Sequence, residues 1–320
     1  MTQTRRRIPL VSLHDYTHGT AQERERFVRV FGEGLREFGF VSVKDHGIPD
    51  DLIRRTYADV ERFFALPTTS KSNYAVPGLA GKRGFTPFGR EHARNRTVGD
   101  LKEFWHVGRD FPPGEEPPLG YGRNVWPVEV PSFRENTRAL YAALDGAAAT
   151  MLEALAEWFA VPRSTFRDMA NEGDSVLRLI HYPPLGNQFE PGAVRAAEHE
   201  DINLLTLLCE GTAPGLELLT RDGEWIPVDT LKGQIVVDSG DMLSRVTNGI
   251  IPATTHRVVN PPSADLDATR YSMPFFVHPW PECVLQPLPS TETAENPARY
   301  PPITANDFLV QRLREIGLIK

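Results

Sequence analysis

Two histidines and an aspartate are spaced in this sequence in a way that suits a metal site. The chain contains His199-Glu200-Asp201, and His256 follows much later. In an extended strand, residues i and i+2 point to the same face, so His199 and Asp201 can direct an imidazole and a carboxylate to one point. A third ligand from a distant strand, His256, would complete a triad of two histidines and one carboxylate. Such a triad suits non-haem Fe(II) because it leaves coordination positions open.

Each of these residues also has an ordinary interpretation. A lone His-x-Asp occurs by chance in many proteins, and a lone His256 would be a partly buried histidine with no ligand role. The surroundings favour the metal site, because strand-like apolar residues follow both pieces. These residues are Ile202, Leu204, Leu205, Leu207 and Leu208 after the first piece, and Val258 and Val259 after the second.

The order of motifs resembles a known enzyme family. The run Arg270-Tyr271-Ser272 follows His256. The succession His-x-Asp, distal His, Arg-x-Ser resembles the isopenicillin N synthase-like branch of the 2-oxoglutarate- and Fe(II)-dependent dioxygenases. Fragments that also match the family lie at residues 8–13, 38–48, 84–87, 102–103, 182–184, 240–241, 247–249 and 255–261. The resemblance therefore covers essentially the whole chain.

The resemblance implies a fold, a set of cofactors and a reaction. The fold is mainly β with flanking helices, built on a double-stranded β-helix of the jelly-roll, cupin-like kind. Fe(II) is bound by His199, Asp201 and His256. The co-substrates are 2-oxoglutarate and O2, and oxidation of a small organic substrate, by default hydroxylation, accompanies decarboxylation to succinate. Arg270 grips the distal carboxylate of 2-oxoglutarate, a task that suits guanidinium, and Ser272 and Tyr182 supply hydroxyl donors.

Other functions remain open at this point. Isopenicillin N synthase and the plant aminocyclopropane carboxylate oxidases carry Arg-x-Ser without consuming 2-oxoglutarate, so the motif indicates an anion clamp rather than one anion. A non-catalytic jelly-roll protein with a structural metal is a further alternative, since zinc also accepts two histidines and a carboxylate. Ile180-His181 stands where the family has Asn-Tyr, and strand alternation places His181 on the face opposite Tyr182.

The substrate pocket is predicted from less specific signals. Arg83 and Phe85 lie in a basic loop that suits an acidic or amino-acid-like substrate, although a solvated charge run would look the same. Phe276, on the strand after Arg-x-Ser, is predicted to wall the pocket. The other basic residues of the loop are Lys82, Arg90, Arg94 and Arg96.

The composition of the chain limits which kinds of partner it can have and which cell compartment suits it. The chain has 320 residues, 40% hydrophobic and 24% charged, with a net charge of -7. We expect a small-molecule partner and no nucleic acid, because phosphate binding needs clustered basic residues. Nothing approaches a membrane-spanning or signal segment, and oligomeric state is left open. Two cysteines, Cys209 and Cys283, make no disulfide framework, which favours the cytoplasm.

The pattern of elements predicts one domain, residues 1–320, in three parts. Residues 1–174 are predicted to be helix-rich, with Thr20 and Glu23 as a capping box, Ser132 as a cap, and residues 66–130 as loop cover near the site. Residues 175–300 are predicted to form the jelly-roll core, with hairpin turns at Asp222-Gly223 and Asn248-Gly249. A helix is expected over residues 305–316, within a C-terminal part 301–320.

Overall fold

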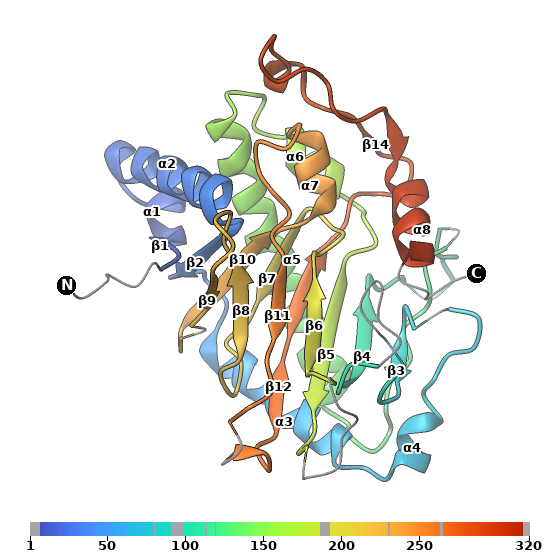
Figure 1. The fold of residues 1–320 in the computed structure, drawn as a ribbon. Coiled ribbons are helices and arrows are strands. Elements are labelled where there is room, and N and C mark those ends of the chain that lie inside the picture. Colours follow the sequence, from blue (N-terminus) through green and yellow to red (C-terminus); the bar gives the residue numbers. More distant parts are fainter. Residues whose placement is uncertain are drawn as a thin grey trace, which may run out of the picture.

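Two β-sheets lie one against the other at the centre of the molecule, and helices cover the larger sheet (Figure 1). This is the arrangement in a computed structural model that describes residues 7–79, 81–90, 99–112, 114–118, 120–185, 193–229, 231–262 and 265–315. Apolar side chains from both sheets form one core between them, and a larger core fills the space between the main sheet and the helices. The predicted mainly-β, jelly-roll class is confirmed.

The main sheet is antiparallel except for one parallel pair at its edge. Its order is β1-β2-β10-β7-β13-β5-β4-β3, and β12 also pairs with β5. The bounds are β1 Leu10–Ser12, β2 Phe40–Lys44, β3 Gly84–Thr86, β4 Glu103–Gly108, β5 Val176–Tyr182, β7 Leu205–Leu208, β10 Gln234–Ser239, β12 Arg270–Ser272 and β13 Pro274–Val277. Strand β5 shows the alternation that a two-sided sheet requires. Leu177 and Leu179 face the helices, whereas Ile180 and Tyr182 face the smaller sheet.

The smaller sheet has the order β6-β11-β8-β9 and carries most of the predicted metal site. Its strands are β6 Ala196–His199, β8 Leu216–Leu219, β9 Trp225–Pro227 and β11 His256–Val258. The hairpin between β8 and β9 turns at the predicted Asp222-Gly223, where Gly223 adopts a positive φ of 85°. A two-stranded sheet of β14, Val284–Leu285, and β15, Ile303–Thr304, lies beside the C-terminal helix.

The helices pack mainly on the outer face of the main sheet. They are α1 Leu13–Thr17, α2 Ala21–Phe38, α3 Asp50–Phe64, α4 Thr68–Ser72, α5 Phe133–Trp158, α6 Thr165–Ala170, α7 Asp241–Val246 and α8 Ala305–Glu315. The predicted capping box at the start of α2 is present, with Thr20 and Glu23 bonded in both directions. Ser132 precedes α5 as predicted, but its hydroxyl donates to the Asp59 carboxylate rather than capping the helix.

Helix α5 is long and apolar enough, by length and composition, to cross a membrane. Half of its most apolar stretch is buried within the protein, and its inner face belongs to the core beneath the main sheet. A core helix meets the same criterion, so this finding carries little weight for a membrane location.

Two sequence predictions are wrong, one for residues 66–130 and one for the turn at residues 248–249. Residues 66–130 are not only loop cover, because β3 and β4 extend the main sheet and α4 precedes them. The N-terminal part thus supplies four strands of the core. The turn at Asn248-Gly249 is not a hairpin either. It ends α7, where the Gly249 N–H donates to the Ser244 carbonyl, and both residues adopt positive φ.

A buried ion pair ties α4 to the edge of the main sheet. The Lys71 ammonium donates to both carboxylate oxygens of Glu103, at 2.6 and 2.8 Å, and to the Phe64 carbonyl. The Glu103 carboxylate also contacts Nδ1 of His181 at 2.8 Å. Burial raises the pKa of Glu103, but the hydrogen bonds from His181 and Lys71 outweigh this effect and lower it. His181 stacks on Tyr271, so it faces away from Tyr182 as predicted.

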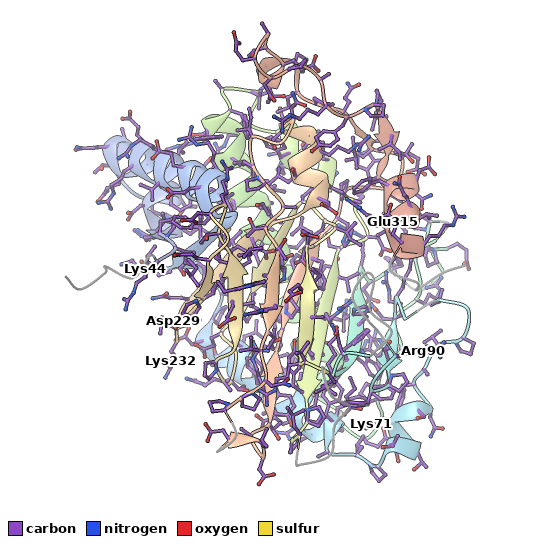
Figure 2. All side chains as sticks on the ribbon, viewed as in Figure 1. Lys44, Lys71, Arg90, Asp229, Lys232 and Glu315 are labelled. Carbon is purple, nitrogen blue, oxygen red and sulfur yellow. The ribbon has the colours of Figure 1, made fainter. Side chains whose placement is uncertain are left out.

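Replacing one partner of this pair should be costly. We expect Lys71→Met to lower the free energy of unfolding by about 3–5 kcal/mol, because it leaves the Glu103 carboxylate buried without its cation. Lys44→Met is the control, since Lys44 and Asp45 are exposed and 3.8 Å apart, and it should cost under about 1 kcal/mol. Figure 2 labels both lysines. Urea denaturation measures both values, and equal losses would contradict the assignment.

Candidate active site

Three potential metal ligands meet at one end of the space between the two sheets. His199 ends β6 and His256 begins β11, and the antiparallel register places these residues directly opposite each other. Nε2 of each histidine lies 3.9 Å from Oδ1 of Asp201. The three candidate ligand atoms lie within 4.8 Å of one another. The sequence-predicted triad is therefore brought together.

The backbone orients both imidazole rings toward this point. Nδ1 of His199 lies 2.7 Å from the Ala197 carbonyl, and Nδ1 of His256 lies 3.1 Å from the Thr254 carbonyl. A carbonyl only accepts hydrogen bonds, so Nδ1 carries the proton and Nε2 keeps a lone pair. Fixing the tautomer through the second ring nitrogen is the usual way in which proteins prepare a histidine ligand.

Asp201 is positioned by contacts outside the strand. We expected it to share a strand face with His199, but β6 ends at His199 and Asp201 lies just beyond it. The Thr206 hydroxyl donates to Oδ2 at 2.5 Å, and the Asp241 N–H donates to the Asp201 carbonyl at 2.7 Å. These bonds leave Oδ1 directed at the two histidines.

The surroundings of His256 favour its neutral form, which is the form that binds a metal ion. Burial, reinforced by the neighbouring His199, lowers the pKa of His256 to about 4. Burial also raises the pKa of Asp238, and the adjacent Asp201 carboxylate raises it further. Two imidazole nitrogens and a carboxylate oxygen suit Fe(II) and also accept zinc. The donor set therefore fits the predicted metal.

A buried guanidinium supplies an anion site deeper between the sheets. Arg270 on β12 pairs with Tyr182 on β5, and its guanidinium carbon lies 4.9 Å from the centre of the tyrosine ring. Only 1% of Arg270 is exposed. Its Nε donates to the Ala213 carbonyl at 3.0 Å, while its buried Nη1 has no partner among the described residues. Ser272 is buried two residues along the same strand, so the predicted clamp residues share one sheet face.

A cavity of about 240 Å³ opens beside the triad. Basic side chains, including Lys82 and, on β5, Arg178, line this cavity, and His106 on β4 and Phe276 on β13 line it with them. Leu309, Arg312 and Leu313 of α8 line it as well. The volume is below the range of about 300–1,000 Å³ that is usual for drug-sized ligands, so the cavity fits a compact molecule.

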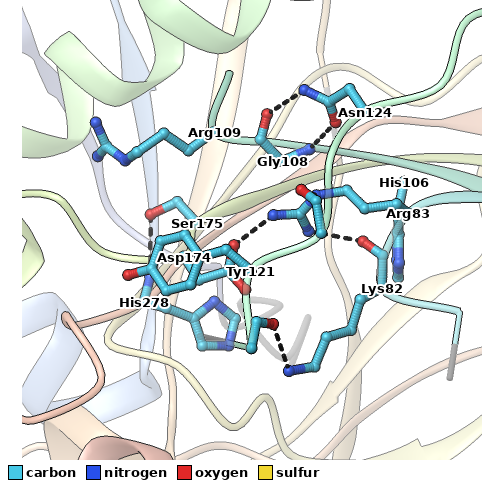
Figure 3. Close-up of polar contacts among 12 residues, drawn as sticks. Lys82, Arg83, His106, Gly108, Arg109, Tyr121, Asn124, Asp174, Ser175 and His278 are labelled. Atoms are coloured by element: carbon cyan, nitrogen blue, oxygen red, sulfur yellow. Dashed lines mark hydrogen bonds and ion pairs between the residues drawn. The ribbon is translucent and has the colours of Figure 1, made fainter. Parts of the chain in front are cut away.

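The structure places the predicted pocket residues differently from one another. Phe276 lines the cavity. Arg83 does not, because its guanidinium is fully buried against the Asp174 carboxylate at 2.5 Å and the Gly122 carbonyl (Figure 3). Phe85 is also buried and packs against Phe63 in the core under the helices. Both predictions are corrected, and in this loop Lys82 lines the cavity instead. Arg94 and Arg96 lie outside the described residues.

Sequence reasoning missed Arg178 as a cavity residue, and it predicted the C-terminal helix without placing that helix at the cavity. Arg178, Ile180 and Tyr182 occupy every second position of β5, so their side chains share one face of the sheet. Strand periodicity counted back from Tyr182 therefore predicts that Arg178 points inward. Its Nε donates to Nε2 of His106 at 2.6 Å, and its guanidinium lies over the rings of Phe104 and Phe276. No comparable signal exists for α8. Its place depends on tertiary contacts such as the Arg312–Asp241 ion pair of 3.0 Å.

Comparison with known protein families covers both halves of the chain. Residues 8–129 match the N-terminal region of the non-haem dioxygenases in morphine synthesis. Residues 173–279 match the 2OG-Fe(II) oxygenase superfamily. A 2-oxoglutarate-dependent dioxygenase, caaD of Aspergillus niger, is 30% identical over 87% of this chain and 86% of its own length.

Solved structures show the same architecture. A 2OG-Fe(II) oxygenase family protein from Caulobacter crescentus is 42% identical, covers 96% of this chain and 98% of its own, and superposes with a TM-score of 0.86. A full-length Neurospora crassa protein, crystallised with alpha-ketoglutarate and thymine, is 27% identical over 96% of both chains, with a TM-score of 0.85. The metal triad, the anion site and these matches agree, and the chain belongs to the 2-oxoglutarate- and Fe(II)-dependent oxygenases.

Proposed function

We propose that His199, Asp201 and His256 hold the catalytic Fe(II), and that Arg270 binds the distal carboxylate of 2-oxoglutarate. The observation that carries this proposal is the buried Nη1 of Arg270, which has no partner among the described residues. Burying a charged hydrogen-bond donor without an acceptor is unfavourable unless a bound ligand supplies that acceptor. A carboxylate matches guanidinium in charge and in its paired acceptor geometry.

Each protein group then has a defined task. The two Nε2 atoms and Oδ1 of Asp201 would hold the metal, and a set of only three protein ligands suits a metal that must also bind a co-substrate and O2. Arg270 sets the direction of the 2-oxo acid, and Ser272 and Tyr182 add hydroxyl groups at the same end. The bound iron supplies the oxidising chemistry, coupled to decarboxylation of 2-oxoglutarate to succinate. The residues around the cavity orient the substrate and keep water away.

We further propose hydroxylation of a compact polar substrate that carries carbonyl or carboxylate oxygens. Arg178 supports this class, because its guanidinium lines the cavity beside the triad and is held over two aromatic rings. A planar cation held in this way presents donors in a fixed direction. The Neurospora crassa relative was crystallised with thymine, a molecule of this size and polarity. That likeness makes carbonyl-bearing heterocycles the first compounds to test.

The net charge and the two cysteines support a separate proposal. We propose that the protein works in the cytoplasm on a free small molecule, without a nucleic-acid or membrane partner. The net charge of -7 and two buried free cysteines support this location. Cell fractionation tests it, and recovery of the protein with membranes would contradict it.

Alanine substitution of a metal ligand should remove activity without unfolding the protein. We expect His199→Ala, Asp201→Ala and His256→Ala each to abolish turnover and to lower the bound iron, because the described residues offer no fourth ligand at this point. Metal analysis after anaerobic loading and far-UV circular dichroism measure the two effects. His46→Ala, at another buried histidine, should keep its iron. A triad variant with normal activity would remove that residue from the site.

Replacing Arg270 or Ser272 should weaken the binding of 2-oxoglutarate and leave the binding of Fe(II) unchanged. We expect Arg270→Leu to weaken 2-oxoglutarate binding roughly a hundredfold or more. The distal carboxylate of 2-oxoglutarate would be buried without its cation, which costs about 3–5 kcal/mol. Ser272→Ala should cost about 1–3 kcal/mol. Calorimetric titration of the anaerobic Fe(II) protein measures both. Unchanged affinity in Arg270→Leu would assign the carboxylate to another group.

A screen for succinate release tests the substrate class. Pyrimidines, small aromatic acids and amino acids should be compared with apolar compounds of equal size. We expect the active compounds to carry oxygen acceptors, and Arg178→Met to raise their KM at least tenfold while substrate-independent succinate release continues. A preferred apolar substrate, or an unchanged kcat/KM in Arg178→Met, would contradict the assignment.

A further inference from the structure

A second arginine, Arg195, is buried beside the clamp. Arg195 lies directly before β6, four residues ahead of His199, and only 1% of it is exposed. Its guanidinium carbon lies 6.0 Å from the centre of the Tyr182 ring, against which Arg270 also packs. The two guanidinium groups therefore lie around the same tyrosine.

The hydrogen bonds of Arg195 leave part of its guanidinium unsatisfied. Nη2 donates to the Ala268 carbonyl at 2.5 Å, while Nε is buried without a partner among the described residues. Ala268 lies two residues before Arg270 in the chain. Arg195 and Arg270 thus share both a tyrosine ring and a short segment of backbone, and each has an unused buried donor.

No carboxylate balances this pair of charges within the described part of the chain. The ion pairs of that part include neither Arg195 nor Arg270. Burial lowers the pKa of Arg195, and the charge of Arg270 lowers it further. Two buried cations without an anion are unfavourable, because each loses hydration and they repel each other. Such a site is suited to a ligand that brings negative charge.

We propose that Arg195 is a second guanidinium of the co-substrate site, so that the distal carboxylate of a 2-oxo dicarboxylic acid is held by Arg195 and Arg270 together. The proposal rests on the role proposed above for Arg270. The hydrogen bonds described for Arg195 go to Ala268 and Asn260 and not to the metal triad, so we assign it to co-substrate affinity and selection. The doubled charge should discriminate strongly against 2-oxo acids that lack a second carboxylate.

A purely structural role makes a different prediction. If Arg195 served only to hold the backbone at the Ala268 carbonyl, its charge would not matter. Its loss would then change the affinity for all 2-oxo acids to the same extent. Charge recognition should instead appear in the ratio of affinities for 2-oxoglutarate and 2-oxopentanoate, which have the same chain length and differ in the distal carboxylate. Arg245 offers a matched control on α7, because it also donates to a carbonyl, lies over two aromatic rings and has a buried Nε without a described partner.

The test is calorimetric binding of both acids to anaerobic Fe(II) protein carrying Arg195→Met, Arg195→Lys or Arg245→Met. We expect Arg195→Met to weaken 2-oxoglutarate binding roughly ten- to hundredfold, as for the loss of a charged hydrogen bond, and to leave 2-oxopentanoate binding nearly unchanged. Arg195→Lys should recover part of the loss, and Arg245→Met should keep the wild-type ratio. The rise in Tm on adding 2-oxoglutarate should shrink most in Arg195→Met, less in Arg195→Lys, and not in Arg245→Met.

Two outcomes separate this inference from the clamp itself. If Arg270→Leu loses the preference for 2-oxoglutarate and Arg195→Met keeps it, Arg195 is structural and the inference fails while the clamp stands. If Arg270→Leu keeps the preference, the clamp assignment fails. An equal loss for both acids in Arg195→Met would also overturn the inference, because it would show a general distortion of the site.

Discussion

Antiparallel pairing of β6 with β11 places His199 opposite His256, and this register decides where the metal can bind. A shift by one residue would turn one imidazole to the other face of the sheet. The pairing becomes irregular just beyond this point, between His256 and Val258. Asp201 then needs to approach from the end of β6, and Thr206 and the start of α7 hold it there. The smaller sheet thus forms the metal site, and the main sheet supplies the anion site and the substrate wall.

Uncompensated charge between the sheets links the fold to the reaction. Most buried charges of the described structure are paired, as in Lys71 with Glu103 and Arg83 with Asp174. Arg270 and Arg195 are buried beside one tyrosine ring, with no acidic partner among the residues that the structure describes. The fold therefore holds positive charge where a dicarboxylate co-substrate is expected, and the metal triad lies toward its other end. Because the site is preorganised, little binding energy is spent on rearranging it.

The sequence predicts the ligands and the core strands better than the pocket. His199, Asp201 and His256 follow from motif order, and the β-rich core of residues 175–300 follows from short-range periodicity. Residues 66–130 lack periodicity, so β3 and β4 are found only through the pairing of β4 with β5 and of β3 with β4. Asn248-Gly249 suits a helix end as well as a hairpin, and the preceding α7 decides between them. The wall formed by α8 depends on Arg312 reaching Asp241 across the cavity, a contact that no local pattern encodes.

The central claim is that one metal ion, held by the triad, and 2-oxoglutarate, held by Arg270, occupy one site. Anaerobic addition of 2-oxoglutarate to the Fe(II) protein measures this most directly. We predict a weak visible charge-transfer band that saturates at one 2-oxoglutarate per iron and is absent with zinc or in His256→Ala. Binding of 2-oxoglutarate without such a band, or oxidation of the substrate at full rate with no 2-oxoglutarate present, would contradict the account.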